Sequence, residues 1–147
     1  MLRDSIANDM RDAMKARDSA RVATLRLLMA AITNVEKEKI HQLDDDEVLE
    51  VIAREAKRRR ESIEAFDKGG RPDLVEKETA ELRVLETYLP ERLSDEELAT
   101  LVDQAIAETG ASQPKQMGEV MKALMPKLRG RADGAQVSAL VRSRLGA

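Results

Sequence analysis

The chain has 147 residues, 36% of them charged, and a formal net charge of −3, so it is long enough for one ordinary domain or two small ones. It has no cysteine and a single histidine, His41, which excludes disulfides, cysteine nucleophiles and multi-histidine metal sites. Tryptophan is absent, and Phe66 and Tyr88 are the only aromatic residues, which disfavours base stacking on single-stranded nucleic acid. No apolar run approaches a membrane span, and the first ten residues lack the apolar segment of a signal peptide. We therefore expect a cytoplasmic protein without a membrane segment, metal or cofactor.

Helical periodicity dominates the first part of the chain, because apolar residues recur every three or four positions. Asp18 or Ser19 is the expected N-cap of a second helix, and Asp45 or Asp46 that of a third. Pro72 suits the first position of a fourth helix. The predicted elements are a first helix carrying Leu2, Ile6, Met10 and Met14, followed by helices over about 19–40, 46–67 and 72–88.

The clearest boundary is YLPERLSDEEL, residues 88–98. Pro90 disfavours the helical conformation at Leu89. Ser94 and Glu97 then have the spacing of a capping box, in which each side chain accepts from the other residue's amide. A new helix is therefore predicted to begin directly after Ser94.

Three helices are expected after this boundary. The first stops at Gly110, the second begins near Pro114 and is broken or bent by Pro126, and the third closes the chain. No period-two alternation is long enough for a strand. We predict an all-α protein with a four-helix N-terminal domain, residues 1–90, and a small three-helix C-terminal domain, residues 91–147.

Charge is distributed unevenly along the sequence. Residues 1–90 hold 17 basic and 20 acidic residues, and residues 91–111 hold one basic and six acidic residues. Residues 112–147 hold seven basic and two acidic residues. The modest overall charge therefore hides a basic C-terminal tip, and clustered charge of this kind steers a partner of opposite sign.

The tip contains KLRGRADGAQVS, residues 127–138, between two predicted helices. Three cations of the tip, Lys115, Lys122 and Arg129, are spaced by seven residues and are predicted to share one helix face. The glycines of the tip let a ligand approach the backbone closely. The last helix also offers free amides at its N-terminus, which suit an anion. The candidate nucleic-acid-binding residues are Lys115, Gly118, Lys122, Lys127, Arg129, Gly130, Arg131 and Gly134.

A capped turn explains the same segment equally simply. Gly130 is a helix stop, and Asp133 is the expected N-cap of the last helix, where a carboxylate repels phosphate. Cations near the end of the preceding helix also suit its dipole. From spacing alone the capped turn is favoured, because glycine caps are commoner than anion sites.

Other features favour structural interpretations. Gly118 costs roughly 1 kcal/mol relative to Ala inside a helix, and we expect it to pack tightly against a neighbouring helix. AKRRRES at 56–62 is expected to be a solvated surface with i,i+4 ion pairs such as Glu55–Arg59. LDDDE at 43–47 lacks the order of an EF-hand and suits helix capping. We predict no catalytic residue and no metal ligand.

Three segments carry a family resemblance: ANDMRDAMKARDSARVATLRLLMAAITNVE at 7–36, LETYLPERLSDEEL at 85–98 and MGEVMKALMPKLRGRADGAQVSALVRSRL at 117–145. Through these segments the sequence resembles the YqeY-like family over essentially its whole length. The family is similar to the tail region of the B subunit of the tRNA-dependent amidotransferase, which converts misacylated Glu-tRNA or Asp-tRNA to the amidated form. The resemblance implies an all-helical, two-part fold and contact with the outer body of tRNA.

The family motif is a Gly-x-Val-Met segment followed by Gly-Arg-Ala-Asp-Gly. It falls here on Gly118, Val120, Met121 and residues 130–134. The resemblance therefore carries the candidate site over to these positions, with Lys122, Lys127 and Arg129 as basic neighbours.

Three functions follow from these observations. The first is a non-catalytic module that binds tRNA or another structured RNA through the basic tip. The second is an adaptor that docks to a larger enzyme of aminoacyl-tRNA metabolism, with the methionine-rich sixth helix as its contact surface. The third, carbon–nitrogen ligase activity with glutamine as amido donor, is implied by family similarity alone. The amidotransferase carries that chemistry in other domains and another subunit, so this chain by itself is not expected to perform it.

Overall fold

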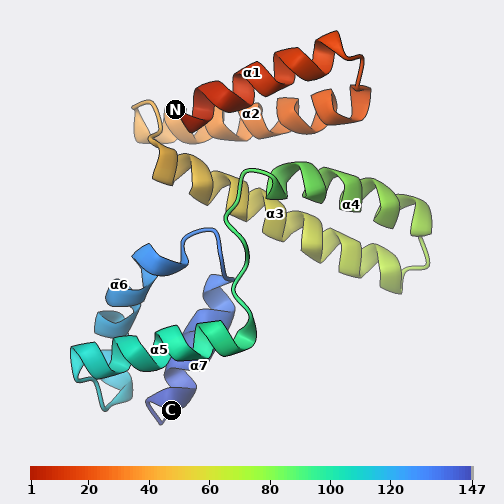
Figure 1. Cartoon of the computed structure of the whole chain (residues 1–147). Coiled ribbons are helices and arrows are strands. Elements are labelled where there is room, and N and C mark those ends of the chain that lie inside the picture. Colours follow the sequence, from red (N-terminus) through yellow and green to blue (C-terminus); the bar gives the residue numbers. More distant parts are fainter. Residues whose placement is uncertain (147) are drawn as a thin grey trace. The chain divides into compact units, whose positions relative to one another are not determined.

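The structure, a computed structural model, describes residues 1–146. All regular secondary structure in this range is helical, which confirms the all-α prediction. The chain forms two compact units, Met1–Leu89 and a second that begins at Pro90. The helices, shown in Figure 1, are α1 (Leu2–Lys15), α2 (Ser19–Lys39), α3 (Asp45–Lys68), α4 (Pro72–Glu86), α5 (Asp95–Thr109), the short 3-10 helix η1 (Pro114–Gln116), α6 (Met117–Leu128) and α7 (Gly134–Arg144).

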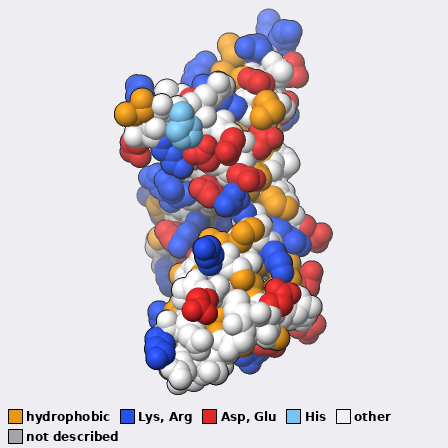
Figure 2. All heavy atoms as spheres, turned by 90° about the vertical axis from the view of Figure 1, so that its left-hand side faces the viewer, with side chains coloured by type: hydrophobic (Ala, Val, Ile, Leu, Met, Phe, Trp, Pro, Cys, Tyr) orange, Lys and Arg blue, Asp and Glu red, His pale blue; other side chains and the backbone are white. Residues whose placement is uncertain are grey.

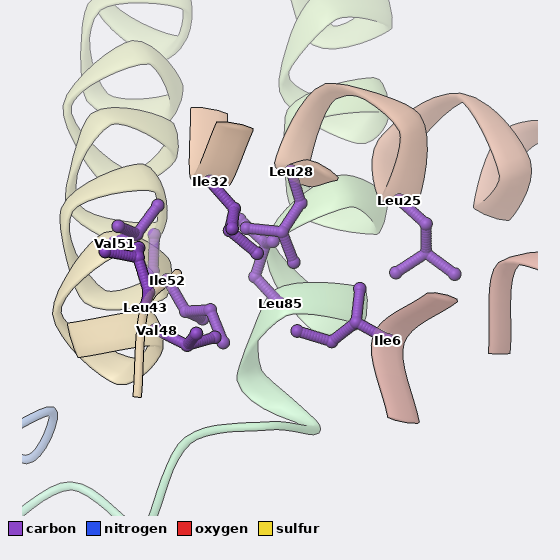
Figure 3. Packing of buried hydrophobic residues seen from close by; sticks show 10 residues of the cluster. Ile6, Leu25, Leu28, Ile32, Leu43, Val48, Val51, Ile52 and Leu85 are labelled. Carbon is purple, nitrogen blue, oxygen red and sulfur yellow. The ribbon is translucent and has the colours of Figure 1, made fainter. Parts of the chain in front are cut away.

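The first unit is built from two antiparallel hairpins, α1–α2 and α3–α4 (Figure 1). Its core is aliphatic, and side chains from all four helices point toward one another in Figure 3. Ile6, Leu28 and Ile52 are fully buried, and each such side chain stabilises the fold by about 1.5–3 kcal/mol. Burial of aliphatic side chains therefore supplies the hydrophobic core of a unit that has only two aromatic residues.

Helix starts follow local rules in the first unit. Asp18 caps α2 as predicted, since its side chain accepts from the Arg21 amide. The prediction for α3 was wrong by one residue, because Asp44 is the N-cap. Asp44 stands three residues before Glu47, so the two form a capping box, whereas Asp45 accepts a hydrogen bond from the Leu2 amide at 2.9 Å.

Arg59 departs from the expected solvated surface. Its predicted pair with Glu55 is confirmed, with Nη1 2.9 Å from Oε2. The guanidinium also lies 3.3 Å from Glu81 on α4, and the side chain is only 13% exposed. The expectation failed because the α3–α4 hairpin folds α4 over this part of α3, which sequence spacing within α3 does not reveal.

The second unit packs α5, α6 and α7 around a separate aliphatic core that includes Val102, Val120 and Leu124. The predicted Ser94–Glu97 capping box is present at the start of α5. No helix in residues 1–146 combines the length and apolarity needed to cross a bilayer.

The sixth helix begins later and is less interrupted than expected. Residues Pro114–Gln116 form the separate turn η1, and α6 then runs through Pro126 to Leu128. Leu124 and Leu128 are both buried, so the turns on either side of the proline are held against the same core. Pro126 therefore does not end the helix.

Candidate nucleic-acid interface

The basic tip is formed by η1, α6, the turn at residues 129–133 and α7. Val120, Leu124 and Leu128 recur every four residues and bury one side of α6. Val137 and Val141 do the same for α7. The exposed residues of α6 and α7 include Lys122, Lys127, Arg142 and Arg144, together with Met125.

Lys115 and Lys122 are the cations of the predicted site whose side chains make no ion pair or hydrogen bond with the rest of residues 1–146. Both are exposed, and neither has an interaction partner within residues 1–146. The three cations predicted to share one helix face do not lie in one continuous α-helix. Lys115 is in η1, Lys122 is in α6 and Arg129 is the C-cap of α6.

Gly118 lies in the first turn of α6, between these two lysines in sequence, and its predicted packing role was wrong. The residue is exposed, and a Cβ added to it would meet no atom within 4 Å. No neighbouring helix therefore requires a glycine here. The backbone of α6 is instead open to an approaching molecule at this point.

The other cations of the site are engaged with their own unit. Lys127 Nζ lies 3.8 Å from Glu108 Oε2, and Arg131 Nε donates to the Glu91 carbonyl at 3.0 Å. Arg129, half-buried at the end of α6, also interacts within the chain. The predicted residues are thus in one region, but they differ in what they can offer a ligand.

The turn itself is capped. Gly130 has a φ of 75°, a left-handed conformation that favours glycine. Asp133 caps α7 by accepting from the Ala135 amide at 3.0 Å, so a carboxylate already occupies this helix N-terminus. Gly134 is exposed. Gln136 does not complete a capping box, because its Nε2 donates to Asp95 Oδ1 on α5 at 3.1 Å.

Folding brings the acidic and basic segments of this unit together. Residues 91–147 contain eight basic and eight acidic residues, so the unit as a whole carries no formal net charge. Besides the Lys127–Glu108 pair, Arg144 Nε lies 3.1 Å from Asp103 Oδ1. Figure 2 shows positive and negative side chains interspersed on the face that it presents. The tip therefore carries individual cations among carboxylates and does not form a uniformly basic surface.

Glu97 links the start of α5 to the turn before α7. The Ser94 amide and hydroxyl hold its pKa below the ordinary value, and the positive charge of Arg131 lowers it further. Arg131 and Glu97 also line one hollow of about 320 Å³, together with Leu93, Thr100, Leu101 and Gln104. The guanidinium of Arg131 therefore lies near the carboxylate of Glu97 at the start of α5.

The acidic segment LDDDE, residues 43–47 of the first unit, caps α3 and forms ion pairs. Glu47 completes the capping box of α3, and its Oε2 lies 2.8 Å from Lys39 Nζ. This hydrogen bond is the main cause of the lowered pKa of Glu47. His41 is exposed, and its Nε2 lies 3.4 Å from the same carboxylate. Across residues 1–146, no three His, Asp or Glu side chains are grouped so that they could hold a metal ion.

Comparison with known proteins places this architecture in a family. A model of the family described as "Yqey-like protein" matches residues 3–145, nearly the whole chain. The chain belongs to the Yqey-like protein family. The two halves of the Gly-x-Val-Met and Gly-Arg-Ala-Asp-Gly motif lie at the start of α6 and in the turn before α7.

Curated relatives carry the name "Altered inheritance of mitochondria protein 41, mitochondrial". The protein from Pyrenophora tritici-repentis is 33% identical over 143 residues, which cover 95% of this chain and 78% of the relative. The one from Kluyveromyces lactis is 36% identical over 114 residues, covering 75% of this chain and 61% of the relative. The name of these relatives states a mitochondrial location for them and states no binding partner.

Proposed function

We propose that this Yqey-like chain is a non-catalytic helical module that binds tRNA or another structured RNA through its C-terminal tip. The observation that carries the proposal is the pair of exposed lysines, Lys115 and Lys122, which have no partner within residues 1–146 and stand on either side of Gly118 in sequence. Two available cations and an open stretch of backbone suit the phosphate backbone of a nucleic acid.

The kind of RNA follows from what the second unit lacks. Residues 91–147 contain no Phe, Tyr or Trp, so unpaired bases cannot stack on aromatic rings there. Double-helical RNA is recognised mainly by shape and by contacts to phosphate and the 2′-hydroxyl. The resemblance to the amidotransferase tail makes tRNA the first RNA to test, and the cytoplasm stays the predicted location.

A protein-interaction adaptor is the second candidate. Met125 lies seven residues after Gly118 on α6 and is 44% exposed, so this large apolar side chain is accessible to a partner. A flexible methionine two helical turns from an open glycine suits close packing of a partner helix. Under this alternative the partner is an enzyme of aminoacyl-tRNA metabolism.

Binding to total tRNA over a salt series tests the first proposal. We expect the Lys115→Gln/Lys122→Gln double variant to weaken binding about tenfold or more. The slope of log affinity against log salt should also fall by about two, because two phosphate contacts are lost. The double variant should remain folded, since both side chains are exposed.

Arg26→Gln/Lys37→Gln is a matched control, because it removes the same charge from two exposed cations of α2. It should bind as the unchanged protein does. Equal weakening by both double variants would indicate general charge attraction and would refute a site at the tip. Absence of tRNA binding at low salt would refute the RNA proposal. Binding of an enzyme of aminoacyl-tRNA metabolism with an affinity that depends on Met125 but not on salt would support the adaptor.

A further inference from the structure

Arg131 fastens the segment that joins the second unit to the preceding helix. Its Nε donates to the Glu91 carbonyl at 3.0 Å, and its own carbonyl accepts from the Leu93 amide at 3.0 Å. Its amide donates to the Leu128 carbonyl at 2.8 Å, which anchors the same residue to the end of α6. One residue of the α6–α7 turn thus holds the Glu91–Leu93 segment at two points.

These contacts leave part of the guanidinium available. Arginine has five N–H donors, and the hydrogen bonds of Arg131 within residues 1–146 use only the one on Nε. The two terminal nitrogens make none, and the residue lines the hollow of about 320 Å³ beside α5. A guanidinium oriented by one hydrogen bond loses less freedom when its terminal nitrogens bind a phosphate.

We propose that Arg131 couples phosphate binding at the tip to the order of the Glu91–Leu93 segment, an inference that rests on the RNA-binding function proposed above. The Nε and carbonyl of Arg131 hold the segment, and its terminal nitrogens bind the phosphate. Coupling between the two is reciprocal, because a linkage between binding and order acts equally in both directions. RNA therefore protects the segment, and a loosened segment weakens RNA binding. Arg131 acts in this way as a positioning residue as well as a contact.

Amide hydrogen exchange of Leu93, measured by NMR on the full chain with and without tRNA, tests the coupling. In the free protein, Arg131→Lys should speed exchange of this amide about fivefold, since one ordinary hydrogen bond of the segment is lost. Added tRNA should slow Leu93 exchange in the unchanged protein and leave it unchanged in Arg131→Lys. The affinity of this variant for tRNA should fall about tenfold.

Arg142→Lys is the matched control, because it makes the same change at an exposed arginine of α7 that lies outside the candidate site. It should leave Leu93 exchange and its response to tRNA as in the unchanged protein. Should Arg131→Lys fail to fold, Arg131→Gln keeps one N–H donor for the Glu91 carbonyl without a charge. That variant should retain part of the Leu93 protection in the free protein and lose the response to tRNA.

The outcomes separate the two proposals. If tRNA does not bind the unchanged protein, the RNA-binding function and the coupling are both overturned. If tRNA binds but Leu93 responds to it equally in Arg131→Lys, only the coupling is overturned. Unchanged Leu93 exchange in the free Arg131→Lys variant would overturn the fastening itself.

Discussion

The two units use their charged residues differently. In the first, Arg59 is 13% exposed and joins α3 to Glu81 of α4, so its charge is enclosed between helices. In the second, Lys127 and Glu108 are 47% and 61% exposed, and their atoms lie 3.8 Å apart. Exposed pairs contribute little to stability and are screened by salt, whereas enclosed pairs are costly to break. Arg59 therefore helps to hold α3 and α4 of the first unit together, whereas the Lys127–Glu108 pair of the second unit stays exposed to solvent.

The largest expected effect comes from Arg59. Arg59→Met should destabilise the first unit by about 2–3 kcal/mol, because Glu55, Glu78 and Glu81 are left together without their cation. Urea unfolding measures the loss. Arg58→Met is the control, since Arg58 is exposed on the same helix, and it should cost less than about 0.5 kcal/mol. Equal losses in the two variants would show that Arg59 is not an enclosed charge.

Tyr88 gives the first unit a pH-dependent contact. Burial, followed by the hydrogen bond from Tyr88 Oη to Asp9 Oδ2 at 2.6 Å, raises its pKa to about 12. The unfolded value is about 10, so this contribution is complete below that pH and is lost as the pH rises through the folded value.

Absorbance of tyrosinate reports this titration directly, because Tyr88 is the only tyrosine and tryptophan is absent. Asp9→Asn should lower the midpoint only partly toward the unfolded value, because burial is the larger cause. Tyr88→Phe should cost about 1 kcal/mol in urea unfolding at neutral pH. A midpoint near the unfolded value in the unchanged protein would contradict the enclosed contact.

Substitution of Gly118 tests whether the backbone of α6 is open at this point or packed against a neighbour. Gly118→Ala should stabilise the second unit by about 0.5–1 kcal/mol, because alanine favours a helix and its Cβ meets no atom within 4 Å. The same variant should weaken tRNA binding several-fold if RNA lies against this turn. Thermal unfolding and binding are measured together, so weaker binding cannot be attributed to a weaker fold.

Gly110→Ala serves as the contrasting substitution. Gly110 has a φ of 68°, so alanine should destabilise there although space is available. A loss of stability in Gly118→Ala as well would restore the interpretation that Gly118 is a packing residue.

The smallest effect is expected at Lys127. Lys127→Gln should change the free energy of unfolding by less than about 0.5 kcal/mol, and even this difference should vanish at high salt. Denaturant unfolding at two salt concentrations measures it. A loss above about 1 kcal/mol that persists at high salt would mean that the second unit encloses its charges as the first does.

Local chemistry accounts for what could be predicted. The Ser94–Glu97 capping box, the Asp18 cap and the stop at Gly110 each depend on residues within about four positions. Asp133 was recognised as a cap for the same reason. The choice of Asp44 over its neighbours was missed, although Glu47 three residues later was a visible signal.

The sequence predicted which residues form the candidate site but did not predict the contacts that these residues make. Spacing indicated that the tip was basic, yet it did not show that Glu91 would take the Nε of Arg131 or that Glu108 would lie beside Lys127. These partners are 40 and 19 positions apart, and charge counting along the chain cannot pair them. Of the five cations predicted for the site, only Lys115 and Lys122 have no partner within residues 1–146.

The sequence by itself determined the helices, their caps and membership of the Yqey-like protein family, because these depend on short-range spacing and on motifs. Tertiary structure alone decided which cations of the second unit are paired within the chain and which stay exposed and unpaired. Packing of α5 against α6 and α7 brings carboxylates and carbonyls to some basic residues and leaves others exposed. It also decided that the Cβ direction of Gly118 points into open space. Coulombic attraction and hydrogen bonding act over a few ångströms in space, and the fold sets which residues come that close.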